Sequence, residues 1–274
     1  MSVNAKTTLC GIIGLPVDHS MSPAIHNAAY QELGLNYVYL AFNVTNVEHA
    51  ICGMQALNIR GFSVTMPHKL EVMKYLDEID PVAQQIGAVN TVVNDDGHLV
   101  GHNTDWQGFI RALKHRTQIQ NKNVVLLGAG GAARAIAFGI KQEHGQLTIL
   151  NRREEIEMAE SLAADVHCSF GDLKDADVIQ HADIIIQATS VGMAPLQHVD
   201  VIDIKLLQSN QIVFDIVYNP MHTKLLKAAK QIGCTVIPGF EMLLLQGVIQ
   251  FELWTGRDAP VEIMRDVLVA RLAK

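Results

Sequence analysis

One stretch restricts the fold of this chain more than any other, because a short apolar strand pattern, a glycine-rich loop and an alanine-rich helix pattern follow one another without a break. Residues 123–135 read NVVLLGAGGAARA, in which Gly128, Gly130 and Ala133 supply the spacing G-x-G-x-x-A. In a strand–loop–helix setting this spacing is typical of dinucleotide-binding domains. We expect Gly128 to permit the tight turn, and Gly130 to let the backbone approach a pyrophosphate at the positive end of the helix dipole. A methyl-donor site, or glycines that serve packing alone, remain alternatives.

Strand and helix patterns alternate along the rest of the chain. Before the loop, apolar strand patterns at 8–15, 37–44 and 60–66 are separated by helix patterns at 22–34 and 46–58. This βαβαβ order predicts a mainly parallel sheet. Residues 88–93 and 98–103 flank the turn sequence NDDG and predict a hairpin. After the loop come strand patterns at 147–151, 182–189 and 211–217, followed by helical periodicity at 242–256 and 261–273.

The expected fold class is therefore α/β with two domains. Residues 1–105 and 240–274 are expected to form an N-terminal α/β substrate domain, to which the C-terminal helices return. Residues 106–239 are expected to form a Rossmann-type dinucleotide-binding domain.

Composition excludes several kinds of partner. A formal net charge of -7 over 274 residues argues against a nucleic-acid surface. No run of 18 apolar residues is free of charge, so no membrane span is expected. The four cysteines lack CxxC spacing and the histidines lack metal-ligand spacing, so no metal site is expected. We expect a cytoplasmic protein with reduced thiols.

The polar residues that follow the second strand of the dinucleotide-binding domain indicate whether NADP or NAD is bound. Asn151, Arg152 and Arg153 follow the strand pattern LTIL, and cations there favour the 2′-phosphate of NADP. Glu154 comes next and could accept from ribose hydroxyls, so NAD stays open.

Two serines begin the first helix pattern. Ser22 precedes Pro23, which predicts Ser22 as the N-cap, and Gly34 stands where a C′ glycine is expected. Together Ser20 and Ser22 put two hydroxyl groups at the positive end of a helix dipole, which suits a small carboxylate.

Five separated motifs, over nearly the whole chain, resemble segments of the shikimate dehydrogenase family. They are HSMSPAIHN, SVTMPHK, GAVNT with GHNTD, the glycine-rich loop with NRR, and VYNP with MLLLQGVIQFELWTG. The resemblance implies reversible NADPH-dependent reduction of 3-dehydroshikimate to shikimate, in chorismate and aromatic amino acid biosynthesis, by a monomer or homodimer.

The same resemblance implies a set of site residues. Catalysis is assigned to Lys69 and Asp105. The substrate contacts implied are Ser20, Ser22, Thr65, Lys69, Asn90, Asp105, Tyr218, Gln246 and Gln250. The cofactor contacts implied are Gly128, Ala129, Gly130, Gly131, Ala132, Asn151, Arg152, Arg153, Thr189, Ile216 and Gly239.

The expected chemistry explains the run GFSVTMPHK. Ketone reduction requires a proton at the oxygen, and a positioned acid such as the Lys69 ammonium lowers that barrier. Pro67 stiffens the turn that aims Lys69, and Asp105 would hold the ammonium. Asp105 could also be the N-cap of the helix that follows it, and the two roles can coexist. His68 is a weaker candidate, because adjacent residues of an extended segment point in different directions.

Two departures from the family pattern keep alternatives open. Ser63 stands where the family usually has Asn, and Ile156 stands where a second arginine is often found. The first departure, with NRRE and QFELWTG, is similar to a branch that also oxidises quinate and tolerates NAD. From a different class, a non-catalytic sensor of nucleotide and ring acid remains possible on fold grounds, although the presence of both Lys69 and Asp105 counts against it.

Overall fold

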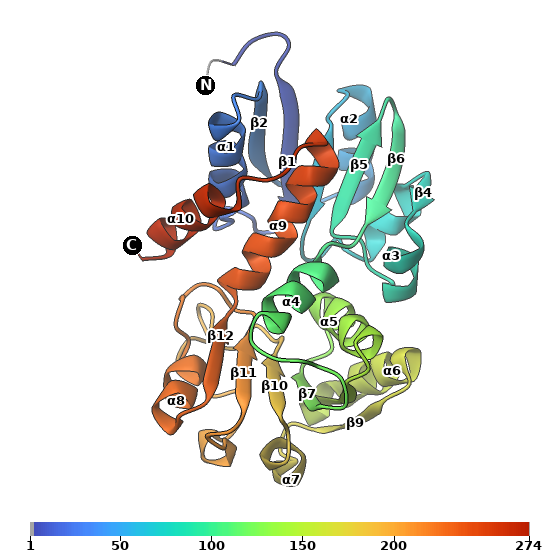
Figure 1. Ribbon diagram of the computed structural model, residues 1–274. Coiled ribbons are helices and arrows are strands. Elements are labelled where there is room, and N and C mark those ends of the chain that lie inside the picture. Colours follow the sequence, from blue (N-terminus) through green and yellow to red (C-terminus); the bar gives the residue numbers. More distant parts are fainter. Residues whose placement is uncertain (1–2, 274) are drawn as a thin grey trace. The chain divides into compact units, whose positions relative to one another are not determined.

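The computed structural model describes residues 3–273, which divide into two compact units. The first unit contains residues 1–105 and 244–274, and the second contains residues 106–243 (Figure 1). Both units are α/β, as the alternating patterns predicted.

The first unit contains a six-stranded sheet of mixed direction, in the order β2-β1-β3-β5-β6-β4. Parallel pairing joins β1 to β2 and β3, antiparallel pairing joins β3 to β5 and β5 to β6, and β4 is parallel to β6. The strands are β1 (Thr8–Gly14), β2 (Tyr37–Asn43), β3 (Gly61–Val64), β4 (Glu78–Ile79), β5 (Thr91–Asp95) and β6 (His98–His102). The predicted hairpin is β5–β6, where Asp96 and Gly97 both have positive φ, as a two-residue turn of type I′ requires.

Helices cover this sheet. They are α1 (Ser22–Glu32), α2 (Val47–Ala56), α3 (Pro81–Ile86) and α10 (Val261–Leu272), together with a 3₁₀ turn at Glu71–Tyr75 and the second part of α9 (Phe240–Thr255). The apolar faces of α2 and the sheet form one core, in which Ile51 and Met54 pack with Ile13, Phe62 and Val92. Next to α1, α10 carries the C-terminal segment back to this unit (Figure 1).

The second unit contains a wholly parallel sheet in the order β12-β11-β10-β7-β8-β9. This is the strand order of a doubly wound dinucleotide-binding fold, in which ligands bind at the carboxyl ends of the strands. The strands are β7 (Asn123–Leu127), β8 (Gln146–Asn151), β9 (Ser169–Asp172), β10 (Ile184–Gln187), β11 (Ile212–Asp215) and β12 (Thr235–Pro238). The helices are α4 (Asp105–Lys114), α5 (Gly131–Gln142), α6 (Ile156–Val166), α7 (Ala176–Gln180) and α8 (Lys224–Ile232), with 3₁₀ turns at Arg153–Glu155 and Ile204–Leu206.

The structure was searched for membrane-spanning helices and for clusters of metal-binding side chains. No helix within residues 3–273 is both long and apolar enough to cross a membrane. Within the same residues, no three His, Cys, Asp or Glu side chains are grouped as metal ligands would be.

Candidate functional site

The first unit brings Lys69 and Asp105 together, although they are far apart in the sequence. Lys69 follows a turn at the end of β3, in which the His68 N–H donates to the Thr65 carbonyl at 3.0 Å. The Lys69 Nζ donates to Asp105 Oδ2 at 2.6 Å, and the two side chains are only 16% and 8% exposed. An ammonium and a carboxylate therefore meet in a largely desolvated place, where their hydrogen bond is stronger than at the surface.

A third group completes this cluster. The Asn90 Nδ2 donates to Asp105 Oδ1 at 2.8 Å, so both carboxylate oxygens accept from side chains of other segments. The Asp105 N–H donates to the Asn103 side chain at 3.1 Å. Asp105 is the first residue of α4, and its carboxylate is turned to Lys69 and Asn90.

The prediction that Ser22 caps α1 is wrong. The cap position is Met21, with no side-chain cap bond, and Ser22 is the first helical residue. The Ser22 N–H donates to Ser20 Oγ at 3.2 Å, so it is the hydroxyl of Ser20 that satisfies a free amide at this helix start. The C-terminal expectation is confirmed, because Gly34 follows the helix with a φ of 63°.

The two glutamines of α9 lie one helical turn apart and are both buried, Gln246 at 7% and Gln250 at 1% exposure. His68 is buried as well, and its Nε2 lies 2.8 Å from the Val44 carbonyl. The Nδ1 of His68 is buried with no hydrogen-bond partner among the described residues.

In the second unit, the glycine-rich loop has the geometry expected of an anion-binding helix start. Gly128 has a φ of 103°, and a Cβ there would lie 2.8 Å from the Thr189 side chain. Gly130 precedes α5 with no side-chain cap bond, and a Cβ there would meet no heavy atom within 4 Å. Uncapped N–H groups beside open space fit a pyrophosphate. The loop also brings Thr189 next to Gly128.

The carboxyl end of β8 carries the residues predicted to select the nucleotide. Asn151 is buried, and its Nδ2 donates to the Glu155 carbonyl at 2.8 Å. Arg152 pairs with the Glu155 carboxylate, whose hydrogen bond raises the pKa of the Arg152 guanidinium. Arg153 is exposed, and no ion pair within residues 3–273 involves it. Arg152 is thus held by an ion pair, and Arg153 is not held by one among the described residues.

Ile216 and Gly239 lie together at the carboxyl ends of β11 and β12. A Cβ at Gly239 would come within 2.3 Å of the Ile216 carbonyl oxygen, so this close packing alone requires a glycine. Burial raises the pKa of the half-buried Tyr218.

Asp215 is the last residue of β11. Burial raises the pKa of its carboxyl group to about 6, while hydrogen bonds from Thr223 and the Val217 N–H oppose the rise. Asp215 was not singled out from the sequence, because a single Asp at a strand end has no distinguishing spacing.

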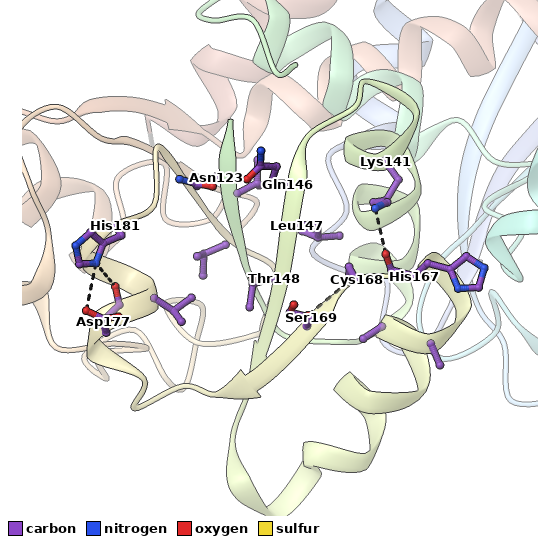
Figure 2. A pocket seen from close by; sticks show the side chains of 15 residues that line it. Asn123, Lys141, Gln146, Leu147, Thr148, His167, Cys168, Ser169, Asp177 and His181 are labelled. Carbon is purple, nitrogen blue, oxygen red and sulfur yellow. Dashed lines mark hydrogen bonds and ion pairs between the residues drawn. The ribbon is translucent and has the colours of Figure 1, made fainter. Parts of the chain in front are cut away.

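A cavity of about 750 Å³ lies elsewhere in this unit, at the amino ends of β7 and β8 (Figure 2). Its charged groups are engaged locally: Lys141 donates to the His167 carbonyl at 3.1 Å, and His181 lies 3.3 Å from Asp177. The cavity is at the opposite ends of the strands from the glycine-rich loop, so it is not a candidate for the dinucleotide.

Comparisons with known proteins cover nearly the whole chain. Three protein-family models match the chain. "Shikimate dehydrogenase substrate binding domain" matches residues 12–92, "Shikimate / quinate 5-dehydrogenase" matches 111–224, and "Shikimate 5'-dehydrogenase C-terminal domain" matches 239–269. The shikimate dehydrogenase (NADP(+)) of Methanocaldococcus jannaschii is 44% identical over 99% of this chain and 100% of its own. The chain belongs to the shikimate dehydrogenase family.

Solved structures of this family superpose on both units. A crystal structure of a shikimate dehydrogenase in complex with NADP+ has a TM-score of 0.94 and 43% identity, covering 100% of this chain and 98% of its own. A quinate dehydrogenase from Corynebacterium glutamicum in complex with NAD has a TM-score of 0.90 and 32% identity, covering 96% of this chain and 99% of its own.

Proposed function

We propose that the protein catalyses the reversible reduction of 3-dehydroshikimate to shikimate with NADPH. The observation that carries the proposal is the 2.6 Å contact between the Lys69 ammonium and the Asp105 carboxylate, both largely buried. When bound, NADPH supplies the hydride to the ketone carbon, and Lys69 delivers a proton to the ketone oxygen. Asp105 holds the ammonium in place, and in the oxidation direction it assists removal of the hydroxyl proton.

The remaining unit 1 residues support binding of a polyhydroxylated ring acid. The hydroxyls of Ser20 and Ser22 stand at the start of α1, where a carboxylate is favoured. Thr65, Asn90 and Gln246 offer hydroxyl and amide groups that suit ring hydroxyls. Tyr218 is assigned to the same substrate by resemblance.

The residues of the second unit fit NADP. The uncapped start of α5, with Gly128, Ala129, Gly130, Gly131 and Ala132, would hold the pyrophosphate. Asn151, Arg152 and Arg153 would face the adenosine ribose and its phosphate, and Thr189, Ile216 and Gly239 the nicotinamide end. Four free cysteines suit a reducing compartment, so a cytoplasmic location is part of this proposal.

A second candidate is a quinate/shikimate dehydrogenase that uses NAD or NADP. Ser63, in place of the family's usual Asn, and the exposed Glu154 favour it, and the similar quinate dehydrogenase was solved with NAD.

One spectrophotometric comparison tests both candidates. Initial rates are measured at the NAD(P)H absorbance with shikimate or quinate, each with NADP+ or NAD+. A kcat/KM highest for shikimate with NADP+ supports the first proposal, and comparable values for quinate or NAD+ support the second. No turnover in any of the four combinations refutes both and favours a non-catalytic sensor. Ser63→Asn should then narrow the substrate range if the second candidate holds.

A further inference from the structure

We infer that Thr91 and Gln250 are positioning residues, which orient the Asn90 amide and through it the Asp105 carboxylate. The inference rests on the proposed function, because it concerns the Lys69–Asp105 pair. Its basis is a chain of side-chain hydrogen bonds through the interior of the first unit.

The chain begins at Tyr39, whose hydroxyl donates to Ser63 Oγ at 2.6 Å. Ser63 Oγ donates in turn to Gln250 Oε1 at 2.8 Å. All three side chains are buried, so these bonds have no competition from solvent. The Ser22 side chain lies beside the same Tyr39 hydroxyl. The chain thus starts next to the proposed carboxylate-binding serines.

From Gln250 the chain continues to the catalytic pair. Gln250 Nε2 donates to Thr91 Oγ1 at 2.9 Å, and Thr91 Oγ1 donates to Asn90 Oδ1 at 2.8 Å. Asn90 Nδ2 then donates to Asp105 Oδ1 at 2.8 Å. From Tyr39 onward, each side chain therefore donates a hydrogen bond to the next, and the last acceptor is the Asp105 carboxylate.

Gln250 controls the direction of the Thr91 hydroxyl. An amide NH₂ can only donate, so the Thr91 oxygen accepts from it and the Thr91 hydrogen is left for an acceptor. Of the two acceptors in reach, Asn90 Oδ1 at 2.8 Å is closer than Thr104 Oγ1 at 3.3 Å. The Thr104 N–H donates to the same Asn90 Oδ1 at 2.7 Å. With its oxygen held by two donors, the Asn90 amide must present its NH₂ to Asp105. The reversed amide would put an oxygen against the carboxylate.

Gln250 itself has little left to offer a ligand. It is 1% exposed, its Oε1 accepts from Ser63, and its Nε2 donates to Thr91 and, at 3.3 Å, to the Asn90 carbonyl. A positioning role accounts for these bonds, and the substrate contact implied by resemblance does not.

The test is a double-mutant cycle with Thr91→Val and Gln250→Met in the full-length enzyme. We expect each single variant to lower kcat about 10-fold, the effect of one lost buried hydrogen bond, with the KM for shikimate little changed. The double variant should lose little more than either single one, because both act through Asn90. Thr91→Ser, which keeps the hydroxyl, should restore kcat.

A matched control is Gln211→Met. Gln211 is also 1% exposed and fully bonded to backbone groups, but it lies before β11, at the amino end of a strand in the other unit. The Gln211→Met substitution should lower the melting temperature while leaving kcat unchanged.

A second readout is hydrogen exchange of the Asn90 side-chain NH₂ by NMR, which should be slow in the wild type and at least 10-fold faster in Thr91→Val.

Several results would overturn the inference: Gln250→Met raising KM with kcat unchanged, fully additive losses, or an unchanged Asn90 exchange rate. If Gln250→Met does not fold, the Thr91→Val and Thr91→Ser pair decides alone. If the wild type shows no turnover, the proposed function fails, and the exchange measurement still tests the hydrogen-bond chain.

Discussion

At the scale of single residues, Lys69 is the group on which the proposed chemistry depends most. Its ammonium is held 2.6 Å from Asp105 and is largely shielded from solvent. Lys69→Ala removes the proton donor, so we expect kcat to fall about 100- to 10,000-fold. The dissociation constant of NADPH, measured by fluorescence titration, should be nearly unchanged. A variant that keeps near-normal turnover would remove Lys69 from the mechanism.

The two neighbouring arginines allow a matched comparison. Arg152 already pairs with Glu155, whereas Arg153 is exposed without an ion pair in the part of the chain described. We expect Arg153→Ala to raise the KM for NADPH about 10-fold or more, because a charge-assisted bond to the 2′-phosphate is lost. Arg152→Ala should have a smaller effect. The KM for NADH should be unchanged in both variants, and a parallel rise for NADH would contradict a phosphate contact.

Asp215 predicts a dependence of stability on pH. Burial raises its pKa to about 6 from an ordinary value of 3.8. Its contribution to stability is therefore fully present below pH 3.8, and it is lost as the pH rises through 6. Asp215→Asn does not titrate, so its free energy of unfolding relative to the wild type should improve by about 2 kcal/mol between pH 4 and pH 7. Denaturant titrations at a series of pH values measure the difference, and a constant difference would exclude the raised pKa.

At the scale of elements, a substitution in the glycine-rich loop before α5 can change ligand binding without changing protein stability. Gly130 has a φ of -78°, which alanine adopts readily, and a Cβ there meets no protein atom within 4 Å. We expect Gly130→Ala to leave the melting temperature unchanged and to weaken NADP+ binding at least 10-fold, because the methyl group occupies the path of the pyrophosphate. Gly53→Ala, in the middle of α2 where a Cβ would meet no heavy atom within 4 Å, is the control that should leave NADP+ binding unchanged and raise the melting temperature slightly. Unchanged NADP+ affinity in Gly130→Ala would place the pyrophosphate elsewhere.

Among the elements that the sequence patterns missed are short strands at the sheet edges. β9 and β12 have four residues each and β4 has two, too few for a period-2 pattern to stand out. The longer, buried strands β1, β7 and β8 were found because their apolar runs are continuous. The cap of α1 was misplaced by one residue, which is within the ordinary uncertainty of helix ends.

At the scale of the whole molecule, the two units are expected to respond differently to ligands. NADP+ at 100 times its dissociation constant should stabilise the native state by about 2.7 kcal/mol. Because the proposed cofactor residues belong to residues 106–243, protection from hydrogen exchange by NADP+ should be concentrated there. Shikimate should protect residues in the first unit, around Lys69 and Asp105. Uniform protection of both units by NADP+ alone would contradict separate binding contributions.

The sequence by itself determined the α/β class, the strand–loop–helix setting of the glycine-rich loop, and the residue types of the proposed site. These features depend on local periodicity and on glycine positions, which a single chain displays directly. Only the tertiary structure decided which side chains meet. Asp105 faces Lys69 and Asn90, and Gln250 is bonded to Ser63 and Thr91, through hydrogen bonds between segments up to 187 residues apart. No local sequence pattern predicts a hydrogen-bond partner at that separation. Ser63 and Gln250 meet only because α9 packs against the sheet in the folded unit.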